Sequence, residues 1–261
     1  MRTNLPQPDL AFDGVTKRFG AVVALDDVTF TAPPGEVTAL VGPNGSGKTT
    51  SLRLTLGLAR PTAGRVLVAG RPYRHLDAPL TWIGALLDAA AVNPGLTGRT
   101  HLRWLAATAG LSPARVDALL EQVGLGAAGR RRVGGYSLGM RQRLGVAAAL
   151  LGDPPILVLD EPMNGLDPEG MVWFRDLVGR LRGEGRTVLV SSHLLRELED
   201  IADRVIVIRH GRIAVDATVD SLITDGGGAD RRGDDGRGGD GRPSLEAAYL
   251  RLVGSLDEAG R

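Results

Sequence analysis

The chain has 261 residues, enough for one large domain or for a domain with an added subdomain. Its net charge of +1, with acids and bases intermixed, argues against a nucleic-acid-binding surface as the main feature. The absence of cysteine excludes disulfides, thiolate-held iron–sulfur clusters and cysteine-ligated zinc. The N-terminus lacks a signal-peptide core and no stretch reaches the roughly 18 apolar residues of a membrane helix, so we expect a soluble, cytoplasmic chain.

The first part of the chain predicts strands around one Gly-rich loop. Residues 9–31 roughly alternate apolar and polar side chains with glycine turns between them, as in short strands. The continuous apolar run VTALVG at 37–42 predicts a buried strand of a parallel sheet. The Gly-rich loop follows, and after it come a helical segment at 49–59 and another strand at 65–70.

The composition changes at about residue 78. Ala and Leu dominate from there to residue 150, and helical spacing recurs at 99–111 and 114–125. We interpret this stretch, about 78–150, as a helical subdomain inserted into the sheet domain.

The sheet pattern then returns. The run PPILVLDEP at 154–162 predicts a buried strand, and an amphipathic helix at 169–185 follows it. A strand at 187–193 precedes a helix at 194–202, and RVIVIRHGRIAVDAT at 204–218 predicts a hairpin.

The C-terminal part has a different composition. Residues 225–242 contain almost nothing apolar, which predicts a disordered linker. Its mixture of Arg and Asp is compatible with a nucleic-acid-binding arm, but the opposite charges cancel, so we favour a solvated spacer. Residues 243–261 predict a short amphipathic helix and a tail.

The loop GPNGSGKTT, residues 42–50, fits the phosphate-binding pattern G-x-x-x-x-G-K-[ST] between a buried strand and a helix. Its glycines let backbone N–H groups turn towards phosphate oxygens, and the helix N-terminus adds positive charge. Lys48, one of only two lysines, is a compact charge that reaches the β- and γ-phosphates, and the Thr49 hydroxyl suits Mg²⁺. The alternative, an ordinary Gly-rich turn, is disfavoured by the complete match in this context. The residues expected to bind nucleotide are Gly42, Pro43, Asn44, Gly45, Ser46, Gly47, Lys48, Thr49 and Thr50.

Two adjacent carboxylates end the strand in ILVLDEP, at the edge where parallel sheets bind ligands. Asp160 suits Mg²⁺, and Glu161 is placed to polarise an attacking water as a general base. Adjacent acids at a strand end are often only surface residues, and the phosphate loop is what favours the functional interpretation.

The segments YSLGMRQRLGVAAALLGDPPILVLDEPMNGLDP and TVLVSSHLLRELE resemble the ATP-binding subunits of ABC transporters. The resemblance covers residues 9–222 and rests on several motifs in the right order. It implies an α/β fold: a P-loop NTPase core of ABC ATPase type with an N-terminal antiparallel β part and an inserted helical subdomain. It also implies that residues 1–224 form one ABC ATPase domain.

The resemblance assigns residues to a site shared by two subunits. Ser137 and Gly139 match the family signature, which contacts the γ-phosphate of ATP bound to the opposite subunit, although Leu138 and Met140 depart from its commonest form, L-S-G-G-Q. Asp167 resembles the D-loop aspartate that communicates between the two sites. Without the family, the Ser137 segment would be only a capped helix start.

Three further residues follow from the resemblance. His193 is similar to the switch histidine, which reaches the γ-phosphate and helps to hold the attacking water, whereas a lone histidine after a strand is usually structural. Phe19 lies where the family often has a tyrosine stacked on adenine, and a core phenylalanine is the alternative. Asp88 falls where the family has Gln or Glu, so we assign it to the metal or to a metal-bound water despite its shorter reach.

The resemblance implies an ATP-binding, ATP-hydrolysing subunit with ATP and Mg²⁺ bound. It would energise a separate membrane permease and lie at the inner face of the membrane. It would pair with a second ATP-binding subunit, for which we favour a homodimer and leave a heterodimer open. Export of a drug, antibiotic or peptide is expected, with no nucleic-acid partner. The alternatives are a soluble ABC ATPase uncoupled from transport and a nucleotide-binding module without turnover, against which Glu161 and His193 argue.

Overall fold

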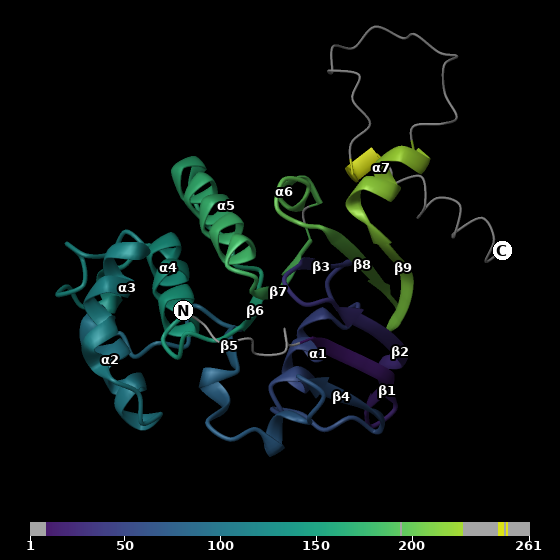
Figure 1. Ribbon diagram of the computed structural model, residues 1–261, viewed down its shortest axis with the longest axis horizontal. Coiled ribbons are helices and arrows are strands. Elements are labelled where there is room, and N and C mark those ends of the chain that lie inside the picture. Colours follow the sequence, from purple (N-terminus) through teal and green to yellow (C-terminus); the bar gives the residue numbers. More distant parts are fainter. Residues whose placement is uncertain (1–8, 194, 227–244, 248, 250–261) are drawn as a thin grey trace, which may run out of the picture.

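The computed structural model describes residues 9–193, 195–226, 245–247 and 249 (Figure 1). Most of the expected linker and most of the expected C-terminal helix lie outside these residues. Helix α7 (Val219–Gly226) runs two residues into the expected linker, which began at residue 225.

Two sheets form the framework of the protein. A three-stranded antiparallel sheet has the order β2-β1-β4, and a six-stranded sheet has the order β5-β6-β7-β3-β8-β9. In the larger sheet neighbouring strands run parallel except for β9, which pairs antiparallel with β8. The strands are β1 (Leu10–Phe19), β2 (Val22–Ala32), β3 (Val37–Val41), β4 (Ala63–Val68), β5 (Ile83–Leu86), β6 (Ile156–Asp160), β7 (Thr187–Ser192), β8 (Arg204–Arg209) and β9 (Arg212–Thr218).

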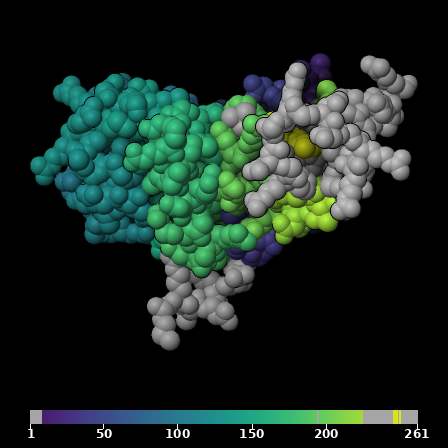
Figure 2. Space-filling model, turned by 90° about the horizontal axis from the view of Figure 1, so that it is seen from above, coloured from purple at the N-terminus to yellow at the C-terminus, as the bar shows by residue number. Residues whose placement is uncertain are grey.

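Helices cover the larger sheet and build a lobe beside it (Figure 1). Figure 2, turned by 90°, shows α5 in green between the teal helical lobe and the light-green C-terminal strands. The helices are α1 (Lys48–Thr55), α2 (Gly98–Thr108), α3 (Val116–Gln122), α4 (Leu138–Ala149), α5 (Pro168–Gly183) and α6 (Leu195–Leu198), with α7 given above. Short 3-10 turns lie at Tyr73–His75, Pro79–Thr81, Pro113–Arg115 and Val133–Gly135.

Strand β5 changes the expected boundary of the helical part. The stretch expected to be helical from about residue 78 contains β5, which pairs in parallel with β6 at the edge of the main sheet. The helical lobe therefore begins after Leu86. The apolar run of β5 is only four residues long, too short to separate a strand from a buried helix segment by pattern alone.

The central strands are buried on both faces, as their apolar runs predict. Alternate residues of β3 face opposite sides. Ala39 and Val41 enter a cluster with the helices, called here the helix-side cluster, whereas Leu40 packs towards the antiparallel sheet. Within the described residues, no helix combines the length and apolar character needed to cross a bilayer.

Parallel register places polar residues side by side at one edge of the sheet. Val41 pairs with Ser192, and Asp160 pairs with Ser191. The carboxyl ends of β3, β6 and β7 thus meet at the edge where ligands bind in such sheets.

The buried His101 of α2 predicts acid sensitivity of the fold. Burial lowers the pKa of His101, so the unfolded chain binds a proton more readily than the folded chain. Its stabilising contribution is fully present above the ordinary histidine pKa of about 6.5 and is lost as the pH falls through the lowered folded-state value. We expect urea melts at pH 7.5 and 5.5 to differ less for His101→Gln than for the wild type. The same change at the exposed His75 serves as control; equal pH dependence of wild type and His101→Gln would contradict the prediction.

Candidate active site

The loop between β3 and α1 adopts backbone angles that need glycine. Gly42 has φ 157° and Gly47 has φ 118°, both in the region that side chains rarely adopt. A Cβ on Gly42 would lie 2.2 Å from the carbonyl oxygen of Ile208, and one on Gly47 would lie 2.5 Å from Cδ2 of Leu25. The loop is therefore held tightly against neighbouring backbone and cannot accept larger residues at these two positions.

The same loop presents unpaired donors to a small cleft. Among the described residues, the backbone amides of Gly45, Gly47, Lys48 and Thr49 have no hydrogen-bond partner. The buried Ser46 hydroxyl likewise lacks a partner there. Unpaired donors at a helix N-terminus fit a phosphate group, whose oxygens would accept from them. The cleft has a volume of about 200 Å³ and is lined by Ala24, Asn44, Gly45, Gly47, Lys48, Thr49, Thr50 and Glu161.

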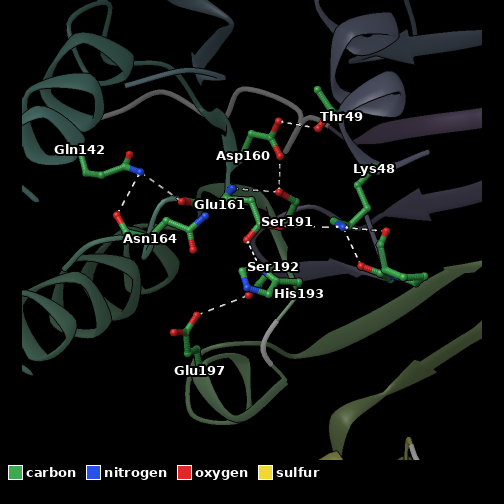
Figure 3. Close-up of polar contacts among 12 residues, drawn as sticks. Lys48, Thr49, Gln142, Asp160, Glu161, Asn164, Ser191, Ser192, His193 and Glu197 are labelled. Atoms are coloured by element: carbon green, nitrogen blue, oxygen red, sulfur yellow. Dashed lines mark hydrogen bonds and ion pairs between the residues drawn. The ribbon is translucent and has the colours of Figure 1, made fainter. Parts of the chain in front are cut away.

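Lys48 lies inside this loop and is only 6% exposed. Its Nζ donates to the carbonyl oxygen of Gly42 at 2.6 Å and to that of Pro43 at 3.3 Å (Figure 3). The Oε1 atom of Glu161 is 3.8 Å away. The ammonium group is thus fixed between the loop and the end of β6, where a bound phosphate would add a stronger charged acceptor.

Asp160, at the end of β6, links three elements. Thr49 Oγ1 donates to Asp160 Oδ2 at 2.9 Å, and the Ser191 hydroxyl donates to Asp160 Oδ1. Asp160 is 9% exposed, so its carboxylate is held in one orientation by two hydroxyl groups. A carboxylate beside a hydroxyl is a donor set that suits Mg²⁺ together with phosphate oxygens.

Glu161 follows directly and faces His193. Its backbone has φ 47°, in the left-handed region that is uncommon for a residue with a side chain. Its amide donates to Ser191 Oγ at 2.9 Å, and its Oε2 lies 2.8 Å from His193 Nδ1 (Figure 3). This backbone turn directs the carboxylate towards the loop and the histidine at once.

Sequence reasoning missed Gln142 and Ser191. The buried Gln142 of α4 donates from Nε2 to the carbonyl oxygens of Glu161 and Asn164, both at 3.3 Å, and so ties the segment after β6 to the helical lobe. Ser191 bonds both Asp160 and the amide of Glu161. The available sequence signals were a glutamine between two arginines in an otherwise apolar helix and a serine at the end of an apolar strand.

Ser137, Gly139 and Asp167 lie in a second cleft of about 470 Å³, which shares no lining residue with the first. Ser137 caps α4 by accepting from the Met140 amide at 3.2 Å, and Asp167 caps α5 by accepting from the Gly170 amide at 2.8 Å. Within one chain, the signature-like segment therefore does not meet the phosphate loop.

Two expected residues do not line the first cleft either. Phe19 is 54% exposed, which excludes a core position, and the Lys17 ammonium lies 4.7 Å from its ring centre. The exposed Asp88 accepts from the amide of Ala90 at 2.7 Å in its own loop. Neither residue lines the first cleft, and among the described residues no hydrogen bond joins Asp88 to Thr49 or Asp160.

Glu197 of α6 is a further half-buried acid near the histidine. Burial raises the pKa of Glu197; the Ser192 hydroxyl and His193 oppose the shift, and Glu161 adds to it. Ser192 Oγ donates to Glu197 Oε2 at 3.4 Å. Figure 3 places Glu197 on the helix that follows His193.

Comparison with known proteins agrees with this geometry. A sequence model described as ABC transporter matches residues 25–164. An uncharacterised ABC transporter ATP-binding protein of Bacillus subtilis, YdbJ, is 40% identical over 82% of this chain and 71% of its own length. The chain belongs to the ABC transporter family. It is an ATP-binding, ATP-hydrolysing subunit of a transporter, which confirms the predicted family and activity.

Two further relatives, with named transport or resistance activities, are similar to this ABC subunit. The lantibiotic transport ATP-binding protein SrtF of Streptococcus pyogenes is 36% identical over 81% of this chain and 91% of its own. The daunorubicin resistance ATP-binding protein DrrA3 of Streptomyces coeruleorubidus is 41% identical over 84% and 71% of the two chains.

Solved structures confirm the predicted fold class. An ATP-binding subunit of an ABC transporter superimposes with a TM-score of 0.79 at 28% identity, covering 94% of this chain and 99% of that one. The dimeric ATP-binding cassette MJ0796, in a post-hydrolysis state with ADP and Pi, superimposes with a TM-score of 0.73 at 25% identity, over 80% and 98% of the two chains.

Proposed function

We propose that two copies of this ABC subunit close head-to-tail over two ATP·Mg²⁺ and that closure energises a separate membrane permease. The observation that carries this proposal is the separation of the phosphate loop from the Ser137 cleft within one chain. A second copy would place its Ser137 segment over the phosphate loop and complete the site. Ser137 caps a helix of 12 residues, so hydroxyl and helix N-terminus together offer an anion-binding group.

The residues at the first cleft, and the predicted residues outside it, have separate proposed tasks. The loop amides and Lys48 bind the phosphates, and Thr49 and Asp160 would hold Mg²⁺, which would neutralise part of the phosphate charge. Glu161 accepts a proton from the attacking water, and His193 keeps the Glu161 carboxylate and the γ-phosphate in position. Phe19 stacks on adenine, and Asp167 lies between the two sites. Asp88 is assigned to the metal or to a metal-bound water, although its Oδ1 atom accepts from the Ala90 amide in its own loop.

The dimer is tested by cross-linking, which the absence of native cysteine makes clean. The two cysteine substitutions are Asn44→Cys and Leu138→Cys. Asn44 lines the first cleft, and Leu138 is half-exposed at the start of α4. When copies of the two variants, each also carrying Glu161→Gln, are mixed, we expect a disulfide between unlike copies with ATP and Mg²⁺. Either variant alone is the control. Equal cross-linking without nucleotide, or none with it, would contradict the head-to-tail arrangement.

We further propose export of a drug, antibiotic or peptide, with the subunit at the cytoplasmic face of the membrane, where ATP is supplied. The support is the named activity of relatives in lantibiotic transport and daunorubicin resistance. A deletion strain should become more sensitive to one member of a panel of such compounds. Wild-type protein should restore resistance and Lys48→Ala should not. Unchanged sensitivity to the whole panel would count against export of these classes.

A further inference from the structure

The helix that follows the proposed switch histidine is short and depends on its neighbours. Helix α6 (Leu195–Leu198) begins two residues after His193 and contributes Glu197 to the site (Figure 3). A helix of four residues has too few internal hydrogen bonds to be stable alone. The position of His193 against Glu161 therefore depends on what holds α6 in place.

The C-terminal segment, here the described residues 245–247 and 249, contacts α6 and the residue after it. The amide of Leu245 donates to Glu199 Oε2 at 3.2 Å, and Arg196 forms an ion pair with Glu246. The two residues of the first contact are 46 positions apart in the chain, and those of the second are 50 positions apart. Figure 1 shows the yellow segment beside α7, close to the end of the sheet that carries α6.

Burial identifies Leu245 as the main anchor of this contact. Leu245 is 0% exposed and belongs to the helix-side cluster, together with Leu195 and Leu198 of α6. Tyr249 packs against the same cluster. The Arg196–Glu246 pair is weak in comparison because Arg196 is 82% exposed and exposed ion pairs contribute little. Burial of the leucine side chain and the bond to Glu199 thus carry the docking.

We propose that the C-terminal segment is a positioning element for hydrolysis: it clamps α6 and thereby keeps His193 Nδ1 against the Glu161 carboxylate, which are 2.8 Å apart. This inference rests on the proposed role of His193 in turnover. The segment thus affects the chemical step and not ATP binding. Its contacts are with α6 and Glu199, and none of its residues lines the first cleft, where the phosphates would bind. Leu245 and Glu199 act through His193 and are positioning residues.

The test uses the full-length chain with Leu245→Ala, which removes the anchor. We expect kcat to fall roughly ten- to a hundredfold, as misplacement of a reacting group by about 1 Å does, while the Kd for a fluorescent ATP analogue stays within about twofold. Leu245→Met should restore most of kcat. The control is Leu111→Ala, which truncates a partly buried leucine that packs against the same cluster from the helical lobe and should leave kcat and Kd unchanged.

Other outcomes are decided by two more variants. If Leu245→Ala does not fold, Glu199→Ala removes the second contact and is judged by the same criteria. An unchanged kcat overturns the inference, and so does a parallel loss of kcat and ATP affinity, because that pattern reports general loosening of the fold. His193→Ala separates the two proposals: if it retains turnover, the role of His193 fails; if it is inactive while Leu245→Ala is normal, only the clamp fails.

Discussion

Lys48→Ala should abolish ATP hydrolysis, lowering kcat by roughly a thousandfold or more, the range seen when a positioned cation is removed from a phosphoryl-transfer site. The reason is geometric. The Lys48 ammonium donates to the carbonyl oxygens of Gly42 and Pro43 and is 3.8 Å from Glu161 Oε1. Among the described residues, no other basic side chain lines the first cleft. Phosphate release by the purified chain at saturating ATP measures the effect.

Two comparisons sharpen the Lys48 result. Arg53→Ala removes an exposed cation from the same helix, α1, and should leave turnover near the wild-type rate. Lys48→Arg keeps the charge but replaces the compact ammonium with a larger, planar guanidinium group. We therefore expect ATP hydrolysis by Lys48→Arg to be strongly impaired as well. Turnover of Lys48→Ala within about twofold of wild type would refute the role of this lysine.

Glu161→Gln should retain ATP and trap the closed dimer while lowering kcat by roughly a hundredfold or more. The amide keeps the size of the carboxylate and its neighbour His193, which lies 2.8 Å from Oε2, but it cannot take a proton from water. Without hydrolysis, nothing drives reopening. Size-exclusion chromatography with ATP and Mg²⁺ should show a dimer for this variant and a monomer without nucleotide.

The control for Glu161→Gln is the same change at Glu121, an exposed residue of α3. It should elute and hydrolyse ATP like the wild type. A Glu161→Gln chain that binds ATP and remains monomeric would contradict the head-to-tail dimer. One that still turns over at the wild-type rate would contradict the role of Glu161 as base.

The sequence predicted the centre of the site because its signals are local. The phosphate loop combines fixed glycines with a strand before it and a helix after it, and Asp160 and Glu161 end a continuous apolar strand. Parallel pairing then brings these strand ends together, as the register of Asp160 with Ser191 shows. Residue type and strand direction were sufficient for this part.

The missed features depend on contacts between distant parts of the chain. Gln142 reaches the carbonyl oxygen of Glu161 from a separate helix. The family resemblance predicted a strand at 82–87, before Asp88, but not that this strand, β5, pairs with β6 at the edge of the main sheet. The amphipathic pattern after residue 243 predicts a helix that needs a partner, but it does not reveal that Leu245 is buried in the helix-side cluster and bonds Glu199. Asp88 was placed by analogy, whereas its carboxylate satisfies the amide of Ala90 nearby.

The central claim is that each of two ATP molecules lies between the same two copies of this chain. A structure of Glu161→Gln crystallised with ATP and Mg²⁺ tests it most directly. The account predicts a γ-phosphate within hydrogen-bonding distance of Lys48 Nζ from one copy and of the Ser137 hydroxyl from its partner. A nucleotide bound to the phosphate loop of a single copy, with every Ser137 cleft open to solvent, would contradict the account.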